Sequence, residues 1–373
     1  MISIDMIFLA TGSILAYAFN AAFYRVPHGW RYMVGLGGIP SILLGVLLFW
    51  CPESPRQLLF HDRKEACLSV IRKMYPKASE SQILAMIASI QEGVNESRAL
   101  NEEMSLRKSA ISLVRVPSSR RAAIVACGLM ATQQFCGFNT LMYYSSTLFQ
   151  IVGFNNPIAV GTVVAGTNWI LTFASIFLID RAGRRRLLLW SMWGMPVFLV
   201  VAAIAFHWIP IDRDTLELTE GSFGWPAIVV LVSMILFVAF YAAGLGCVPW
   251  QANEFLPMEV RAIGTMMINV SNWGPNIIVS STFLSMMSGM TPSGTFGFYA
   301  GLSTLGYIFV YFCYPEAAGM TLEDIRHVFE HGFGVQYAEE WRKQRKMGLV
   351  EHGHRVNHLQ QVGHPQRSGV DDV

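Results

Sequence analysis

Charged residues are scarce in this sequence. Only 14% of its 373 residues are charged and 53% are hydrophobic, with a mean hydropathy of +0.40. A soluble domain carries about a quarter charged residues, so this chain has too few to cover a water-facing surface. Its apolar residues form long uninterrupted blocks without an amphipathic pattern. These features exclude a soluble enzyme, a nucleic-acid binder and a disordered chain, and they predict an integral membrane protein.

The apolar blocks are long enough to cross a membrane as helices. A helix needs about 20 mostly apolar residues to span the hydrocarbon, whereas barrel strands alternate over about ten residues. A cleaved signal at the first block is disfavoured, because it lacks a basic region and has Asp5 early. The sequence therefore predicts an all-α membrane protein with eight transmembrane helices, at roughly 4–24, 32–50, 122–145, 158–179, 187–208, 225–248, 263–287 and 294–313.

Basic residues lie almost entirely on one side of this predicted topology. Of the 27 Lys and Arg residues, 24 fall in segments 51–121, 180–186 and 249–262 or in the tail after 313. Basic loops remain in the cytosol, so both termini and the 51–121 connection are expected to be cytosolic. No cysteine lies in a predicted outer loop, and so no disulfide framework is expected.

Spacing divides the chain into four parts. Residues 1–50 hold two helices, 51–121 form a cytosolic connection, 122–313 hold six helices and 314–373 form a cytosolic tail. Apolar residues at helical spacing over 79–92 predict short amphipathic helices in the connection. The tail is predicted to be largely disordered, because it lacks periodicity from residue 332. A metal site at His352, His354 and His358 is the less favoured interpretation, and no cofactor or metal is expected.

Polar side chains gather in the middle of the block 122–145, which contains Gln133, Gln134 and Asn139. Amides in hydrocarbon cost free energy unless hydrogen-bonded, and such residues often mark a transport pathway. An amide offers donors and an acceptor, which suits a neutral ligand rich in hydroxyls. A straight helix would point Asn139 about 140° away from Gln134, but Gly137 permits a break that lets them converge. The alternative, hydrogen bonds that only join helices, fits a lone amide better than this cluster.

Four motifs then reveal a family resemblance. Segment 133–145, Gln-Gln-x-x-Gly-x-Asn-x-x-x-Tyr-Tyr-Ser, resembles the seventh-helix motif of the sugar porters in the major facilitator superfamily. Segments 52–56 and 180–186 resemble the motifs that close helix six and join helices eight and nine. Segment 314–319 resembles the motif after helix twelve, with Ala317 in place of threonine. The resemblance covers 4–330 and implies that fold, with the eight predicted helices equivalent to helices 5–12 of twelve.

Two further segments, 248–257 and 271–276, look most like the fungal myo-inositol transporter branch, although hexose porters share much of this pattern. The resemblance implies a set of substrate-binding residues: Gln133, Gln134, Asn139, Asn168, Trp250, Asn272 and Asn276. Trp250 suits packing on the apolar face of a sugar or cyclitol. The resemblance also favours a cytosolic gate of ion pairs that break when the inner face opens, built from Glu53, Arg56, Asp180, Arg184, Arg185, Glu254 and Arg261. For the basic residues of this set, topology determination is the alternative interpretation.

The chain departs from the sugar-porter pattern in its missing helices and at two polar positions. Helices one to four are absent from the alignment, and with them the carboxylate associated with proton coupling in complete relatives. The helix-five glutamine of the family aligns with Ser13, and the helix-ten glutamate of many hexose porters aligns near Ala242. This pattern leaves two expectations, a truncated gene product or a genuine remnant.

The sequence thus predicts transport of a myo-inositol-like polyol or sugar by alternating access, in the plasma membrane. A hexose porter is one alternative. Another is a non-transporting remnant, a sensor or a regulatory partner that associates with a full-length porter. A membrane enzyme is disfavoured, because the predicted spans hold neither carboxylate pairs nor histidine clusters. The expected partners are a small neutral polyhydroxylated solute and the lipid bilayer, without nucleic acid.

Overall fold

The computed structural model describes most of the chain, and within the described residues the regular structure is helical apart from one short pair of antiparallel strands, β1 (Val350–Glu351) and β2 (His354–Arg355). The fold is therefore all-α, as predicted. The described residues are 2–103, 106–211, 218, 224–257, 259–317, 320, 322–330, 332–346, 350–351 and 354–355.

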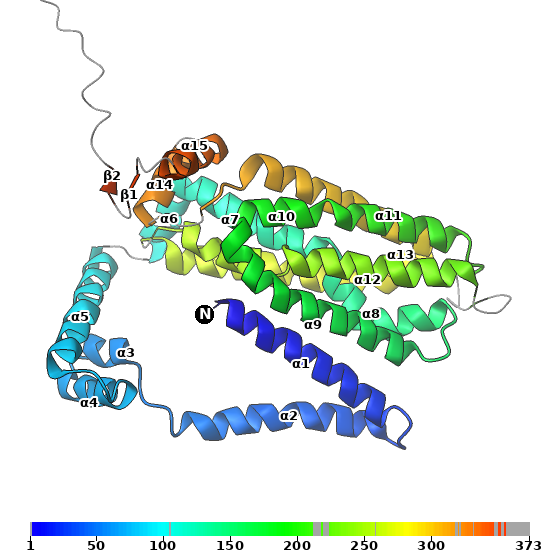
Figure 1. The fold of residues 1–373 in the computed structure, drawn as a ribbon, viewed down its shortest axis with the longest axis horizontal. Helices are drawn as coiled ribbons and strands as arrows, with labels where there is room; N and C mark the ends of the chain where they lie inside the picture. The colour runs from blue at the N-terminus through cyan, green and yellow to red at the C-terminus, as the bar shows by residue number, and fades with distance from the viewer. Residues whose placement is uncertain are drawn as a thin grey trace, which may run out of the picture.

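Long helices run roughly along one axis and form a bundle (Figure 1). Its core lies among the helices after residue 117, where large side chains such as Phe149, Phe237 and Met195 are almost completely buried. The helices of the bundle are α1 (Ile2–Phe23), α7 (Pro117–Phe135), α8 (Phe138–Ile151), α9 (Pro157–Ala182), α10 (Arg184–Met192), α11 (Gly194–His207), α12 (Trp225–Ala243), the 3-10 helix η1 (Val248–Phe255) and α13 (Arg261–Cys313).

Local sequence explains where several helices begin. Proline stands in the first turn of α7, α9 and α12, where the missing N–H costs nothing and the fixed φ suits a helix. Ahead of α9, the Asn156 side chain accepts a hydrogen bond of 3.2 Å from the backbone N–H of Ala159. This contact caps the helix by satisfying one of its unpaired donors.

In the described residues, six helical stretches are long and apolar enough to cross a membrane. Eight were predicted, and two features account for the difference. The 53 residues of α13 would extend about 80 Å as one helix, far more than the ~30 Å hydrocarbon core. The chain instead turns back at Thr291, whose φ is 69°. Helix α13 therefore comprises the two predicted helices 263–287 and 294–313. The block 122–145 is divided between α7 and α8, and neither part qualifies alone.

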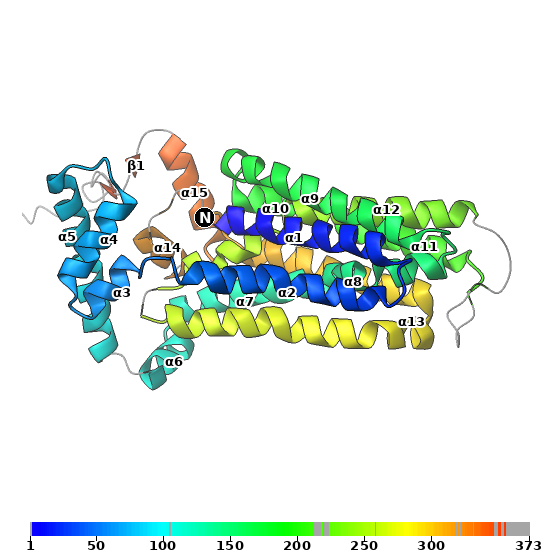
Figure 2. The same ribbon diagram turned by 90° about the horizontal axis from the view of Figure 1, so that it is seen from below.

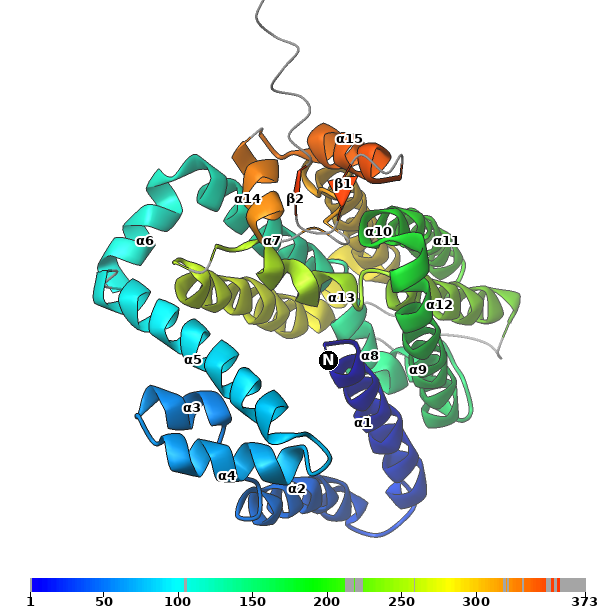
Figure 3. The same ribbon diagram turned by 60° about the vertical axis from the view of Figure 1, so that its left-hand side comes forward.

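The two N-terminal helices differ in how they pack. Helix α1 lies against α9, where Trp169 Nε1 donates a hydrogen bond of 2.9 Å to Thr11 Oγ1. The Tyr17 hydroxyl lies 2.5 Å from Ser145 Oγ in α8. Helix α2 (Gly29–Leu48) buries only Gly29 and stands apart from the bundle (Figure 3). Of this pair, α1 is therefore the one that forms part of a site with the bundle.

Most of the 51–121 connection forms a small helical unit beside the bundle (Figure 2). The helices of this unit are α3 (Pro55–Phe60), α4 (Lys64–Met74) and α5 (Glu80–Glu103), whereas α6 (Leu106–Arg115) packs against α7 and α13. Leu59, Cys67 and Ile71 belong to a separate apolar core between α3, α4 and α5. Helix α5 covers nearly all of the segment 79–92, where short amphipathic helices were predicted, and it continues to Glu103.

The tail is more ordered than predicted. Helices α14 (Leu322–Glu330) and α15 (Val335–Lys346) occupy part of the segment 314–373 that was expected to be largely disordered. The Arg121 guanidinium donates a hydrogen bond of 2.9 Å to the Phe329 carbonyl, and the Phe329 ring packs on Phe255. These contacts with the bundle explain the order. His352 and His358 of the less favoured metal site lie outside the described residues, and only the backbone of His354 is described, in β2.

Candidate functional site

A cavity of about 310 Å³ lies between α1 and the helices that follow residue 117. This volume is near the lower limit of the roughly 300–1,000 Å³ found for small-molecule sites, so the cavity suits a small solute. None of the described residues that line it carries a formal charge. Six of the seven predicted substrate contacts line it: Gln133, Gln134, Asn139, Asn168, Trp250 and Asn272.

The break predicted at Gly137 is present. Helix α7 ends at Phe135 and α8 begins at Phe138, with Gly137 between them at φ 84°. Other residues rarely adopt this left-handed conformation, and a Cβ there would lie 3.1 Å from the Tyr299 ring. Because of the break, Asn139 Nδ2 reaches Gln134 Oε1 and donates a hydrogen bond of 2.6 Å. The two amides converge on the cavity, which a straight helix would not allow.

Gln134 is the centre of an amide network. Its Oε1 accepts hydrogen bonds from Asn139 and, at 2.9 Å, from Asn276 Nδ2. Its Nε2 donates to Asn272 Oδ1. Asn276 does not line the cavity and supports Gln134 from behind it. Four of the predicted side chains, which come from α7, α8 and α13, are thus fixed relative to one another.

Gln133 has an unpaired acceptor. Its Nε2 donates hydrogen bonds of 2.8 and 3.2 Å to the carbonyls of Leu245 and Gly246, after α12. Its Oε1 is buried and has no hydrogen-bond partner among the described residues. An unpaired buried acceptor costs about 1–3 kcal/mol. A ligand hydroxyl in the cavity would remove that cost.

Asn168 and Trp250 complete the predicted set. Asn168 lies on α9 and is 8% exposed. Trp250 lies on η1, and its side chain is half-buried against the apolar core. The cavity thus combines amides from several helices with an aromatic ring, an arrangement that suits a neutral solute with both hydroxyls and an apolar face.

Sequence reasoning missed part of the lining. Thr172 lies four residues after Asn168 and so occupies the same face of α9, a signal that was available. On the α1 side, only Ser13 had been noted. Other lining residues carried no signal in the sequence, because apolar and aromatic side chains are common in every span: Met6, Leu9, Ala10, Phe138, Met142, Tyr241 and Trp273.

A cluster of charges lies where α10 begins and α13 ends, and we call this the basic end of the bundle. Arg184 forms an ion pair with Glu254. The Arg185 guanidinium instead donates to backbone carbonyls, at 3.1 Å to Val310 and 2.8 Å to Tyr311. Arg184 and Glu254 thus form an ion pair, whereas Arg185 holds the end of α13 through these carbonyls.

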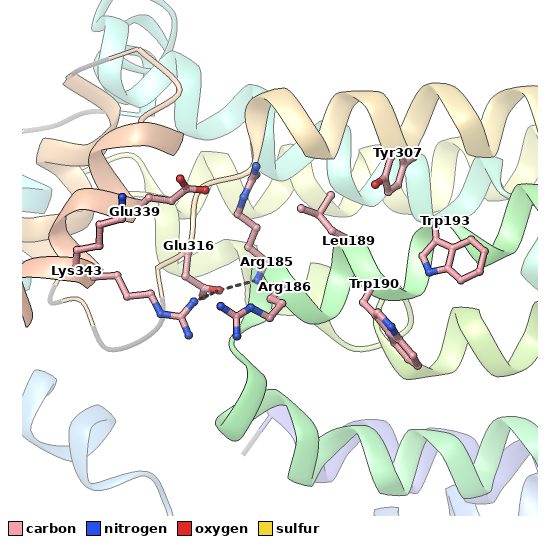
Figure 4. Close-up of a pocket in the computed structure, with 10 residues that line it drawn as sticks. Arg185, Arg186, Leu189, Trp190, Trp193, Tyr307, Glu316, Glu339 and Lys343 are labelled. Carbon is pink, nitrogen blue, oxygen red and sulfur yellow. Dashed lines mark hydrogen bonds and ion pairs between the residues drawn. The ribbon is translucent and has the colours of Figure 1, made fainter. Parts of the chain in front are cut away.

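Glu316 is a member of this cluster that the predicted gate lacked, although the motif 314–319 contained it. Its carboxylate is 4% exposed and accepts hydrogen bonds from the backbone N–H groups of Arg184, at 3.1 Å, and Arg185, at 3.0 Å. Figure 4 shows the contact of Glu316 with Arg185. These groups begin α10, where a negative charge is stabilised. Gly183, at φ 88°, permits the approach, because a Cβ there would lie 2.7 Å from Glu316 Oε2.

The other predicted gate residues are placed elsewhere. The Arg261 guanidinium donates a hydrogen bond of 3.1 Å to the Leu256 carbonyl, five residues earlier. Glu53 and Arg56 are exposed near the start of α3, outside the bundle (Figure 1). The structure therefore does not bring Glu53 and Arg56 to the basic end. The backbone of Asp180 lies in α9, and its side chain is outside the description.

Bundled apolar helices around a cavity that the described residues line with amides are typical of membrane transporters. The chain belongs to the family of sugar (and other) transporters, whose pattern matches residues 1–329. Members of this family are transporters and not enzymes.

The relatives with similar sequences belong to a narrower group within this family. The chain is 41% identical over 352 residues to Myo-inositol transporter 1 of Cryptococcus neoformans var. grubii, covering 94% of this chain and 62% of that protein. It is 38% identical over 373 residues to Myo-inositol transporter 1 of Saccharomyces cerevisiae, covering 99% of this chain and 63% of the relative. The chain therefore spans less than two thirds of the length of these relatives.

Solved structures share the fold. The proton:xylose symporter XylE bound to 6-bromo-6-deoxy-D-glucose matches with a TM-score of 0.67 at 23% identity, covering 88% of this chain and 66% of XylE. The inward open conformation of XylE from E. coli matches with a TM-score of 0.66 at 24% identity, covering 87% and 64%. The chain accordingly shares the fold of these XylE structures over most of its length.

Proposed function

We propose that this chain binds a small neutral polyol, with myo-inositol the first candidate, and carries it across the plasma membrane by alternating access. The observation that carries the proposal is the amide network around Gln134 together with the unpaired acceptor of Gln133. Amides pair with hydroxyls as donors and acceptors. The absence of formal charge in the described lining favours a neutral solute over an ionic one.

The proposal of myo-inositol over a hexose rests on the relatives. Proteins named as myo-inositol transporters match most of this chain at 38–41% identity. A ring with a hydroxyl on every carbon would pair with several of the convergent amides at once, while Trp250 packs on its apolar face. A hexose offers similar groups, so a hexose porter is the nearest alternative.

We further propose a topology of eight transmembrane helices, equivalent to helices 5–12 of the family, with both termini in the cytosol. Segment 122–313 would supply a complete six-helix half and 1–50 two helices of the other half. The reversal of α13 at Thr291 and the division of 122–145 into α7 and α8 support this count. The positive-inside distribution of Lys and Arg supports the orientation.

Two cysteines of the connection test this orientation. Cys51 is exposed, whereas Cys67 is buried, and burial raises the pKa of its thiol. A membrane-impermeant maleimide should leave Cys51 unlabelled in intact cells and label it once the membrane is permeabilised. Cys67 should remain unlabelled near pH 7 in both cases, because the thiolate that reacts forms only at higher pH. Labelling of Cys51 in intact cells, lost in Cys51→Ser, would place the connection outside and overturn the topology.

The ion pair between Arg184 and Glu254 is proposed as part of a cytosolic gate. It joins the start of α10 to η1, which also supplies Trp250 to the cavity. Movement of η1 would therefore change the cavity and the ion pair together. A two-state contact of this kind is the element that alternating access requires.

Uptake and binding together test the function. In a cell line without inositol transporters, the chain should raise uptake of tritiated myo-inositol above the vector control. Unlabelled myo-inositol should compete better than glucose, and the reverse order would favour the hexose porter. The purified chain should also bind tritiated myo-inositol in detergent. Absence of both uptake and binding, with the chain present in the membrane, would reject the proposal.

A second candidate function follows from the exposure of α2. Helix α2 buries only Gly29, and side chains such as Val34 and Ile42 are 73% and 69% exposed. A helix with so many exposed apolar side chains is suited to packing against another membrane protein. The chain would then be a non-transporting partner of a full-length porter. Binding without uptake, and co-purification with a full-length porter, would favour this role. Uptake restored only by adding four upstream helices from a relative would assign transport to the longer form.

A further inference from the structure

A second cavity, of about 650 Å³, lies at the basic end of the bundle. It is separate from the amide cavity and lies between α10, the last turns of α13 and α15. Figure 4 shows Arg186 and Trp190 on α10 and Trp193 directly after it, with Glu339 and Lys343 of α15 across from them. The cavity therefore has a charged end and an aromatic end.

The charged end has an excess of positive charge. Four basic side chains line the cavity, against the two carboxylates of Glu316 and Glu339. Glu316 already accepts two backbone hydrogen bonds, and Arg342 lies 3.9 Å from it. Arg186 and Lys343 are exposed and form no hydrogen bond or ion pair with any residue the structure describes. These two cations remain available to an anion.

The aromatic end continues the same face of α10. Arg186, Trp190 and Trp193 are spaced at four and three residues, so they form one stripe along the helix. Trp190 and Trp193 are 57% and 47% exposed. The stripe passes from a guanidinium at the start of α10 to indole rings about 10 Å along the bundle axis. A stretch of high hydropathy, from Arg184 to His207, begins at this point.

We propose that this cavity binds an anionic phospholipid of the leaflet at the basic end, with its phosphate at Arg186 and Lys343 and an acyl chain along Trp190 and Trp193. Basic residues at the cytosolic membrane surface attract anionic headgroups, and tryptophan is enriched at the same depth. A soluble phosphate would use the cations alone, whereas a phospholipid uses both ends. The site does not depend on the proposed substrate, since it shares no lining residue with the amide cavity.

Native mass spectrometry of the purified full chain in detergent tests the site. The chain should retain dioleoyl phosphatidylserine in preference to dioleoyl phosphatidylcholine. The double variant R186Q/K343Q should need about tenfold more phosphatidylserine for half-saturation, with phosphatidylcholine retention unchanged. The matched control R63Q/K64Q removes two exposed cations from the 51–121 connection, and it should behave as the original chain does.

Two further comparisons separate the sources of the phosphate. Glycerophosphoserine has the same headgroup without acyl chains and should fail to displace phosphatidylserine at equal concentration. W190A/W193A should lower phosphatidylserine retention, because it removes the acyl-chain surface while leaving both cations. Displacement by glycerophosphoserine would overturn the lipid assignment in favour of a soluble phosphate ester. An equal loss in R186Q/K343Q and R63Q/K64Q would overturn the site itself.

Discussion

Replacing Gln134 with alanine is expected to weaken binding of myo-inositol about 100-fold. Gln134 holds Asn139, Asn272 and Asn276 in place through its two amide atoms. Without it, buried amides lose their partners at about 1–3 kcal/mol each and no longer converge on the cavity. A loss of about 2.7 kcal/mol corresponds to a factor of 100. Equilibrium binding of tritiated myo-inositol to the purified variant measures the effect.

The control for this variant is Gln150→Ala. Gln150 is exposed at the end of α8 and does not line the cavity, so affinity should stay within about twofold. The amount of monodisperse protein after purification distinguishes loss of binding from loss of folding. A well-folded Gln134→Ala chain that binds myo-inositol normally would show that the amide network is only a contact between helices.

Replacing Glu316 with alanine is expected to give the largest loss of stability. The carboxylate is 4% exposed and satisfies the backbone N–H groups of Arg184 and Arg185 at the start of α10. Removing it leaves both donors unpaired and leaves nearby Arg342 without its counter-charge. Each buried backbone donor that is left unpaired costs about 1–3 kcal/mol. The midpoint of thermal inactivation should fall by about 6 °C or more, measured by size-exclusion chromatography after heating.

Two variants complete this experiment. Glu316→Gln keeps one oxygen acceptor and should lose about half as much stability as Glu316→Ala. Glu340→Ala removes an exposed carboxylate from α15 and should change the midpoint by less than about 1 °C, because surface charges contribute little. Equal midpoints for Glu316→Ala and Glu340→Ala would mean that Glu316 does not stabilise the start of α10.

The sequence was informative where a function depends on local spacing. The break at Gly137 was predicted, because glycine between two amides permits the left-handed turn that a transport helix needs. The long apolar blocks predicted helices, since a bilayer leaves backbone groups no other partner over that length. The same reasoning failed for the tail, because α14 is held by contacts such as Arg121 with Phe329, which lie 208 residues apart.

The predicted gate also shows that the sequence does not reveal which distant residues come into contact. Charge and motif placed Arg184 and Glu254 near cytosolic helix ends, and the fold does pair them. The same evidence grouped Glu53 and Arg56 with them, yet these lie on a separate helical unit. Periodicity reports which face of a helix is apolar, but it carries no information about which distant helix covers that face.

The sequence by itself determined that this chain is an all-helical membrane protein of the sugar transporter family, with polar amides in mid-span. Composition and block length decide this, because hydrocarbon tolerates few charges and only internally bonded backbone. Only the tertiary structure decided that Gln134 joins Asn139, Asn272 and Asn276, and that Glu316 caps α10. These contacts depend on the packing of helices distant in sequence, and packing fixes positions to within a hydrogen-bond length.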